Sequence, residues 1–204
     1  MDKKRKAPRE TGMASGSCEK RKKSASSSSP PTMPDPSAAQ GAIEITVDGV
    51  VIKGYHIFRR RPLLGLRMKV VPEPDNPMDK DALVVVMPPL DSIPTADHDV
   101  VTDTKRSTTV RHIAGKWIGR LPAGLSTILR RMKAEGEVAE LTCVATGEPR
   151  QSFAPWPMPG QKGGGAVIPC KLHVQVTDRE RAIAALKSAF ESDLGPEKAA
   201  LVIV

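Results

Sequence analysis

Apolar and polar residues first alternate regularly over residues 43–48, which is the period of a strand with one buried face. Apolar positions continue over residues 50–58, and Gly54 within them predicts a bulge or a sharp bend. Alternation returns over residues 64–70. A continuous apolar run over residues 82–87 predicts a short strand that is buried on both faces.

The next strand and the first helix are predicted together. Residues 116–121 have the composition of a strand, and Pro122 follows, a residue suited to the first turn of a helix. Apolar residues then recur at i, i+3, i+4 and i+7, which predicts an amphipathic helix ending at Gly136. The apolar positions are Leu125, Ile128, Leu129 and Met132.

Two further strands and a second helix complete the pattern. The strands are predicted over residues 138–144 and 166–176. Thr177 and Glu180 have the spacing of a capping box, so the helix is predicted to begin there. Its apolar stripe consists of Ile183, Leu186 and Phe190. Many short strands with two helices predict a mainly β domain, a small barrel with helical additions.

Two long connections interrupt these elements. Residues 88–110 lack periodicity and predict a surface loop, and residues 149–165 are rich in Pro and Gly. The triplet Gly163-Gly164-Gly165 precedes a strand rather than a helix and predicts a flexible loop. We expect Trp117 and Phe190 in the core. Trp156 is expected either to contact a partner or to cover one end of the barrel.

Composition separates the first 40 residues from the rest. Residues 1–40 contain no Val, Ile, Leu, Phe, Tyr or Trp, but eight Ser and five Pro. Such a segment cannot bury enough apolar surface to offset its ordering entropy, so we predict a disordered tail. We expect the domain to span residues 41–194, followed by a short C-terminal extension over residues 195–204.

The positive charge is concentrated in this tail. The formal net charge is +8, and residues 1–40 account for +5 of it, with nine Lys/Arg and four Asp/Glu. Two short basic clusters separated by a flexible spacer are typical of a bipartite nuclear-import signal, although a solubilising tail has the same composition. We therefore expect a nuclear protein that binds an import receptor. The clusters are Lys3, Lys4, Arg5, Lys6 and Lys20, Arg21, Lys22, Lys23.

Several kinds of chemistry lack support in the sequence. No GxxxxGK[ST] motif is present, and no nucleophile, base and orienting group stand in a recognisable arrangement. The three cysteines, Cys18, Cys143 and Cys170, form no CxxC pair, and the four histidines are scattered. No apolar run approaches the ~20 residues of a membrane span. We expect a binding protein without enzymatic activity, metal, cofactor, small-molecule substrate or membrane partner.

The most distinctive segment is EPDNPMDKDALVV, residues 73–85. Pro fixes the backbone and Asn and Asp accept local hydrogen bonds, so this segment predicts a rigid polar connection between two strands. It resembles the signature of the HIRAN domain. WIGRLPAGLSTIL at residues 117–129 is similar to the second block of that family. GEVAELTCVATG and AVIPCKLHV, at residues 136–147 and 166–174, are similar to its later strands.

The resemblance implies a modified OB-like barrel that binds single-stranded DNA or its 3′ ends, in DNA repair, replication or chromatin. It implies that Asp79 accepts a hydrogen bond from a terminal 3′-hydroxyl and that Asn76 shapes the same pocket. Met78 would contact the terminal base, at a position where the family usually has Tyr. The expected phosphate contacts are Arg59, Arg60, Arg61, Lys80 and Arg120; further basic residues of the domain are Arg67, Lys69 and Lys116.

Three interpretations of this resemblance remain open. In the first, the barrel binds DNA through these residues. In the second, it is a protein-interaction module, because Met78, Ile57 and Ala166 occupy positions where DNA-binding relatives have aromatic residues and because only 3% of the residues are aromatic. In the third, the tail alone contacts DNA without sequence preference, and removing residues 1–40 abolishes binding.

Overall fold

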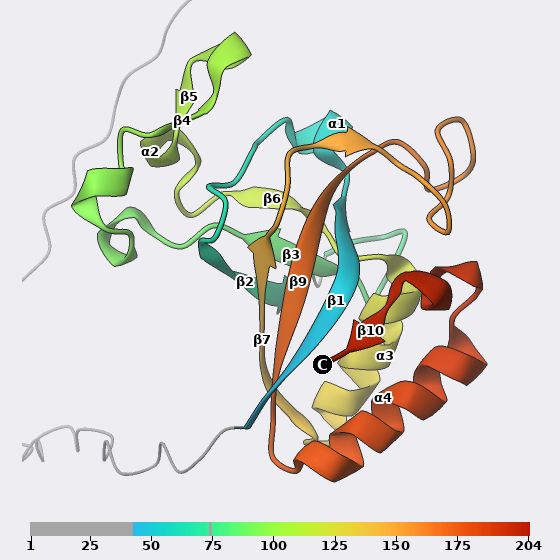
Figure 1. Cartoon of the computed structure of the whole chain (residues 1–204). Helices are drawn as coiled ribbons and strands as arrows, with labels where there is room; N and C mark the ends of the chain where they lie inside the picture. Colours follow the sequence, from blue (N-terminus) through green and yellow to red (C-terminus); the bar gives the residue numbers. More distant parts are fainter. Residues whose placement is uncertain (1–42, 74) are drawn as a thin grey trace, which may run out of the picture. The chain divides into compact units, whose positions relative to one another are not determined.

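The structure is a computed structural model that describes residues 43–73 and 75–204. The tail predicted over residues 1–40, with both basic clusters and Cys18, lies outside the described residues. The fold that follows is that of the domain alone (Figure 1).

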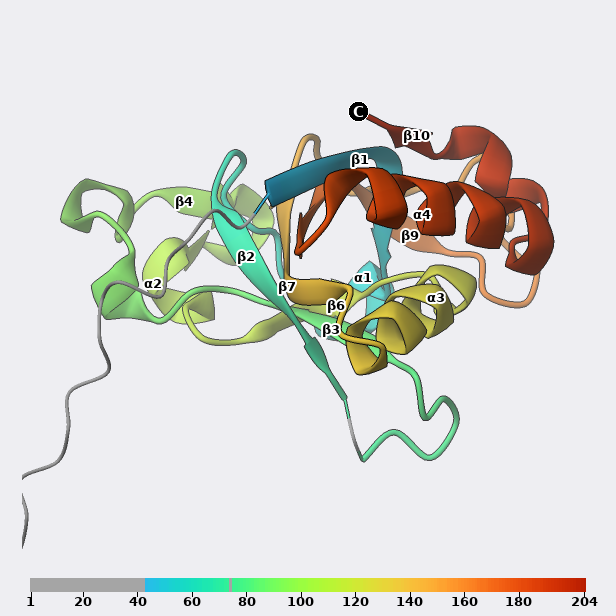
Figure 2. The same ribbon diagram turned by 90° about the horizontal axis from the view of Figure 1, so that it is seen from below.

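Six antiparallel strands close into a barrel, which confirms the predicted small, mainly β barrel (Figures 1 and 2). The ring order is β1-β6-β3-β2-β7-β9, and a second pairing of β1 with β9 closes it. Closure leaves none of these strands as a free sheet edge along its whole length. The strands are β1 (Ile43–Lys53), β2 (Arg67–Pro72), β3 (Leu83–Val86), β6 (Trp117–Arg120), β7 (Val138–Ala145) and β9 (Ala166–Val176).

Strand β1 pairs with β9 along its whole length, and a second partner at its end closes the barrel. A bulge between Val47 and Val50 bends the strand, and Gly49 in the bulge has φ +78°. At its end, Lys53 pairs with both Val167 of β9 and Arg120 of β6. Gly119 allows this junction, because a Cβ atom there would overlap the Lys53 carbonyl oxygen.

Two long helices, α3 (Ala123–Ala134) and α4 (Arg179–Asp193), lie side by side on one side of the barrel (Figure 2). Both were predicted, and their apolar stripes are buried as expected except for Ile183, which is half-buried. The N-cap of α4 is Asp178, not Thr177, because the Asp178 carboxylate accepts the Arg181 N–H at 3.1 Å. The cap is therefore one residue later than the sequence predicted.

Two single-turn helices were not predicted. Gly54, with φ +88°, ends β1 and begins α1 (Tyr55–Phe58), so the predicted sharp bend is confirmed, but the apolar residues after it are helical. Helix α2 (Val110–Ile113) follows the predicted loop. Four-residue helices are too short to show a periodic apolar stripe, so the pattern gave no signal for them.

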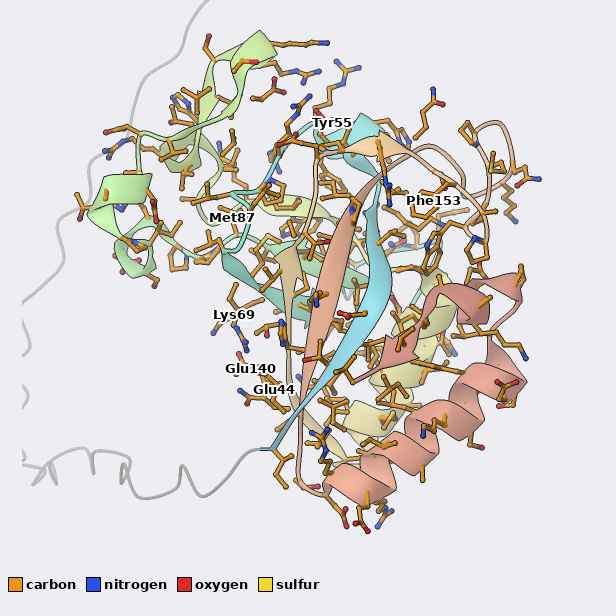
Figure 3. All side chains as sticks on the ribbon, in the orientation of Figure 1. Glu44, Tyr55, Lys69, Met87, Glu140 and Phe153 are labelled. Atoms are coloured by element: carbon orange, nitrogen blue, oxygen red, sulfur yellow. The ribbon has the colours of Figure 1, made fainter. Side chains whose placement is uncertain are left out.

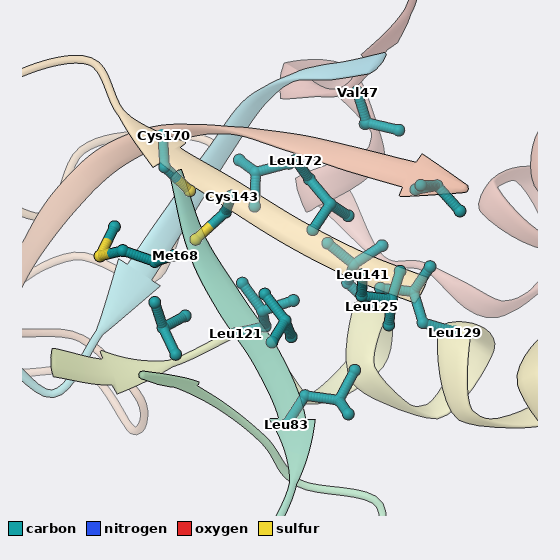
Figure 4. Packing of buried hydrophobic residues seen from close by; sticks show 14 of the residues in the cluster. Val47, Met68, Leu83, Leu121, Leu125, Leu129, Leu141, Cys143, Cys170 and Leu172 are labelled. Atoms are coloured by element: carbon teal, nitrogen blue, oxygen red, sulfur yellow. The ribbon is translucent and has the colours of Figure 1, made fainter. Parts of the chain in front are cut away.

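One contiguous apolar core fills the barrel and extends under α3 and α4 (Figure 4). Cys143 and Cys170 face inward from the neighbouring strands β7 and β9, and both are buried free thiols. Burial raises the pKa of the Cys170 thiol well above its ordinary value, and the adjacent Cys143 adds to this. The two thiols therefore behave as small apolar residues of the core.

The expectation of an irregular surface loop over residues 88–110 was wrong. The segment contains three 3₁₀ turns and a small second sheet, and Ile93, Val110 and Ile113 join the core. The apolar positions are too far apart in sequence to produce a period, so their burial was not visible in the pattern. The elements are η2 (Leu90–Ser92), η3 (Thr95–Asp97), β4 (Val101–Asp103), η4 (Thr104–Arg106) and β5 (Thr108–Thr109).

The two remaining segments also pair with the barrel. Strand β8 (Arg150–Gln151), within the Pro/Gly-rich connection, pairs with β9. The predicted C-terminal extension contains η5 (Pro196–Ala200) and β10 (Val202–Ile203), and β10 pairs with β1. Trp156 is only 2% exposed and packs with Val51 and Val167. Of the two expected roles, it therefore covers the barrel and does not offer its ring to a partner.

Ion pairs of Asp103 hold residues 88–110, the inserted segment, to the barrel. Its carboxylate is 1% exposed, accepts a hydrogen bond from Arg106 at 2.6 Å, and lies 3.8 Å from the Arg61 guanidinium. Burial alone would raise the pKa of Asp103, but the hydrogen bond from Arg106 and the charges of Arg61 and Arg106 outweigh it. The pKa therefore lies below its ordinary value of 3.8.

We expect Asp103→Asn to lower the free energy of unfolding by about 1–3 kcal/mol at pH 7, because two guanidinium groups lose a buried partner. A depressed folded-state pKa stabilises the fold above the unfolded-state value and loses this effect as pH falls. The difference between wild type and variant should therefore shrink below pH 4. Urea unfolding at pH 7 and pH 3 measures both. Asp99→Asn, which removes an exposed ion pair with Arg111, is the control and should change stability little. If wild type and Asp103→Asn differ in unfolding free energy by the same amount at both pH values, the ion pairs assigned to Asp103 are contradicted.

Candidate nucleic-acid interface

The connection between β2 and β3 is held by its own polar side chains. The side-chain oxygen of Asn76 accepts hydrogen bonds from the backbone N–H groups of Met78 and Asp79 at 3.0 and 3.2 Å. Its side-chain NH₂ group donates to the Glu73 carboxylate at 3.0 Å. The Asp79 carboxylate accepts the Asp81 N–H at 3.0 Å. The predicted rigid polar turn is therefore present, and the side chain of Asn76 forms its hydrogen bonds within this turn.

Of the three predicted pocket residues, Asp79 keeps the most capacity for a ligand. Only one of its oxygens accepts a hydrogen bond from the described residues, and the side chain is half-buried beside Arg120. Met78 is 92% exposed and contacts no apolar cluster. Lys80 follows, exposed and without an ion pair in the described part of the chain.

Arg120 links this turn to the rest of the face. Its guanidinium donates from Nε and Nη2 to both carboxylate oxygens of Glu73, and it lies 5.3 Å from the centre of the Phe58 ring. The hydrogen bonds from Arg120 hold the pKa of the buried Glu73 carboxyl below its ordinary value, against the opposing effect of burial. Two of its three nitrogens are thus committed to Glu73, which leaves Nη1 for a ligand.

The three consecutive arginines point to different partners. Arg59, in the left-handed region at φ 52°, donates to the His56 carbonyl oxygen, and Arg60 donates to the Trp117 carbonyl oxygen at 2.7 Å. Arg61 instead donates to the Tyr55 hydroxyl, in the cluster around Asp103. Arg59 and Arg60 therefore contact α1 and β6, whereas Arg61 contacts the inserted segment.

Other basic residues of the domain are paired on the outer face of the barrel, where Lys69 and Glu140 lie together (Figure 3). Arg67 forms a bidentate ion pair with Glu44, at 2.6 and 3.2 Å. These carboxylates neutralise the basic face that the sequence showed along β2. They make it a poor surface for phosphates.

An aromatic pair, of which only Trp117 is exposed, lies beside Arg120. The rings of Phe58 and Trp117 meet edge to face, with their centroids 6.4 Å apart. Trp117 is 42% exposed, so its expected place in the core was wrong, whereas Phe190 is buried as expected. Trp117 begins a short strand, and alternation along β6 turns its ring to the surface while Ile118 points inward. Ile57, in α1, is 61% exposed.

A cavity of about 170 Å³ lies on the other side of Arg120. Cross-strand pairing places Lys53 opposite Arg120, so both side chains lie on the same face of the sheet. His56 of α1 adds a third nitrogen-bearing side chain. The remaining lining residues are Gly54, Gly163, Gly164, Gly165, Ala166 and Val167, so no carboxylate lines the cavity.

Lys53 was not singled out from the sequence, and the glycine triplet was interpreted only as a loop. Residue type gave no signal, because an isolated lysine at a strand end is common on protein surfaces. Only closure of the barrel brings Lys53, Arg120 and the triplet to one place. A Cβ atom at Gly163 would lie 3.3 Å from Lys53 Nζ, and one at Gly165 would lie 3.3 Å from His56 Nδ1.

Comparisons of the chain with protein-family models, curated proteins and solved structures find no match. The HIRAN resemblance therefore stays a prediction that rests on the residues quoted for it. Across residues 43–73 and 75–204, no group of three or more His, Cys, Asp or Glu side chains could hold a metal ion. Within the same residues, no helix is both long and apolar enough to cross a membrane.

The contrast between the two tryptophans gives a direct check of this face. We expect acrylamide to quench the fluorescence of Trp117 efficiently and that of Trp156 weakly, because their exposures are 42% and 2%. Trp117→Phe should remove most of the quenchable emission, and Trp156→Phe should leave it. Equal quenching in the two variants would contradict the arrangement.

Proposed function

We propose that the barrel binds single-stranded DNA, strand ends included, on the face formed by α1, β6 and the β2–β3 connection, as the HIRAN resemblance implies. The observation that carries the proposal is the exposed Trp117, packed edge to face on the half-buried Phe58, beside Arg120 and a cavity lined by Lys53 and His56. An aromatic surface next to fixed cations is the combination that single-strand binders use.

Stacking supports this role at a position different from the one the family suggests. Met78, Ile57 and Ala166 provide no aromatic ring, but Trp117 offers one to the solvent on the same face. A base stacks on an exposed ring without sequence preference, and each such contact contributes about 1–3 kcal/mol. The lack of aromatic residues at the three family positions is thus partly offset.

Unpaired cations on this face support binding there. Carboxylates pair with Arg67 and Arg61 elsewhere, whereas Arg59, Lys53 and Lys80 form no ion pair within the described residues. Counterion release from the few phosphates contacted there would give a modest salt dependence. The domain itself carries little net charge, so affinity would depend on this local arrangement.

The proposal includes import into the nucleus by the two basic clusters of residues 1–40 and a role without catalysis. The tail adds non-specific electrostatic affinity for DNA, and this contribution is the same in every variant that leaves it intact. Tests within the full chain can therefore isolate the barrel.

We expect Trp117→Ala to weaken binding of a fluorescein-labelled oligo-dT strand by the full chain about 5- to 100-fold, the equivalent of one lost stacking contact. Fluorescence anisotropy at two salt concentrations measures this, and Trp117→Phe should retain most of the affinity. Val202→Ala, at an exposed residue of β10, is the control. A second variant replaces Lys20, Arg21, Lys22 and Lys23 with Gln. If Trp117→Ala leaves the affinity unchanged and this second variant abolishes binding, the tail contacts the DNA. No binding by any form would favour the protein-interaction module.

Asp79 gives a second test, of end recognition. Asp79→Asn retains the oxygen that accepts the Asp81 N–H but loses the charge, so the turn should stay folded. We expect it to abolish a preference of about tenfold for a strand ending in a 3′-hydroxyl over one ending in a dideoxynucleotide, since hydrogen bonds to charged groups contribute about 1.5–3 kcal/mol. Asp75→Asn, exposed in the same turn, should keep the preference. Wild type binding both ends equally would exclude Asp79 as the acceptor.

A further inference from the structure

We infer that the cavity between α1, β6 and the Gly163–Gly165 loop is an anion site that takes the terminal phosphate of a nucleic-acid strand. This inference rests on the proposed function and names a chemical group that the site selects. The group is a phosphomonoester at either end of a strand, in contrast to the hydroxyl assigned to Asp79. Asp79 does not line the cavity, so the two groups would occupy different places.

The charge of the cavity wall is the first argument. Lys53 and Arg120 are cationic, His56 adds an imidazole ring, and every other lining residue is glycine or apolar. Like charges placed opposite each other on neighbouring strands repel, and of these two only Arg120 forms an ion pair, with Glu73. A bound anion would supply the charge that this pair of strands lacks.

Lys53 itself lacks a partner. About half of it is buried, and within the described residues its ammonium forms neither a hydrogen bond nor an ion pair. Burial lowers the pKa of Lys53, and the charge of Glu197 in η5 opposes this only in part. A buried ammonium without hydrogen-bond acceptors is costly. A phosphate in the cavity would provide them.

The glycine loop brings backbone close to these cations. Gly163 and Gly165 have φ +80° and +139°, conformations that residues with a Cβ atom rarely adopt. A Cβ atom at either position would press on Lys53 or His56, and one at Gly164 would overlap the Met158 carbonyl oxygen. The N–H groups of Gly163 and Gly165 donate to no backbone carbonyl of the described residues, so they are available to an anion.

Size and charge together favour a terminal phosphate. A cavity of about 170 Å³ is smaller than the roughly 300–1,000 Å³ of sites that enclose whole small molecules, so it suits one phosphate group with the nucleoside outside. Arg120 connects the cavity to the Phe58–Trp117 pair, on which the adjoining base would stack. A terminal phosphate carries about −1.5 to −2 charge at pH 7, whereas an internal diester carries −1, and two or three cations favour the former.

The test compares three short oligo-dT strands that differ only at their ends: 5′-phosphate, 3′-phosphate, and hydroxyl at both ends. Anisotropy competition with the full chain should show that one phosphorylated strand binds about tenfold more tightly than the hydroxyl strand. Lys53→Met should remove this advantage, so that all three strands bind the variant with the same affinity. Lys133→Met, at an exposed lysine of α3 outside the site, should keep it.

Inorganic phosphate provides a second probe that does not depend on DNA binding. It should raise the melting temperature of the wild type and of Lys133→Met, but not that of Lys53→Met. Equal binding of all three strands, with no phosphate-dependent stabilisation, overturns the anion site and leaves the proposed function standing. Phosphate stabilisation that depends on Lys53, without binding of any strand, keeps the anion site but overturns both the proposed function and the nucleic-acid ligand. A terminal-phosphate advantage that survives Lys53→Met places that phosphate elsewhere and overturns the assignment.

Discussion

The pairing of Lys53 with Arg120 is the constraint on which the rest of this structure depends. At this point β1, still paired with β9 on one side, pairs with β6 on the other, and the sheet becomes a closed ring. The same pairing puts two cations on one face of the sheet at the barrel end. Gly119 permits the close approach of the strands, and Gly54 turns the chain immediately afterwards into α1. Architecture and candidate site therefore have a common origin.

Ion pairs connect other parts of the domain. Glu73 binds Arg120, Asp103 binds Arg106 and Arg61, and Glu44 binds Arg67. Each pair also links segments distant in sequence, except Asp103–Arg106 within its turn. These carboxylates neutralise Arg67, Arg61 and Arg106, whereas Lys53, Arg59 and Lys80 form no ion pair among the described residues. Such a local group of unpaired cations would charge the proposed binding face even in a domain of low net charge.

Much of the fold could be predicted from residue patterns. Strands such as residues 43–48 and 166–176 and helices α3 and α4 have clear periods, because one face of each is buried against the same core. The inserted segment around β4 and β5 was missed, since Ile93, Val110 and Ile113 reach the core singly and leave no period. The cap of α4 was misplaced by one residue because Thr177 and Asp178 are both good capping residues.

The sequence by itself determined the six barrel strands and the two long helices, because these depend on local periodicity. It also determined the rigid turn around Asn76 and Asp79, because this turn depends on hydrogen bonds between residues close in the chain. Only the tertiary structure decided that Trp117 is exposed, that Arg59 and Arg61 diverge, and that Lys53 faces Arg120 under the Gly163–Gly165 loop. Those outcomes depend on strand register and on barrel closure, which join residues more than 60 positions apart. A shift of register by one residue would turn each of these side chains to the opposite face.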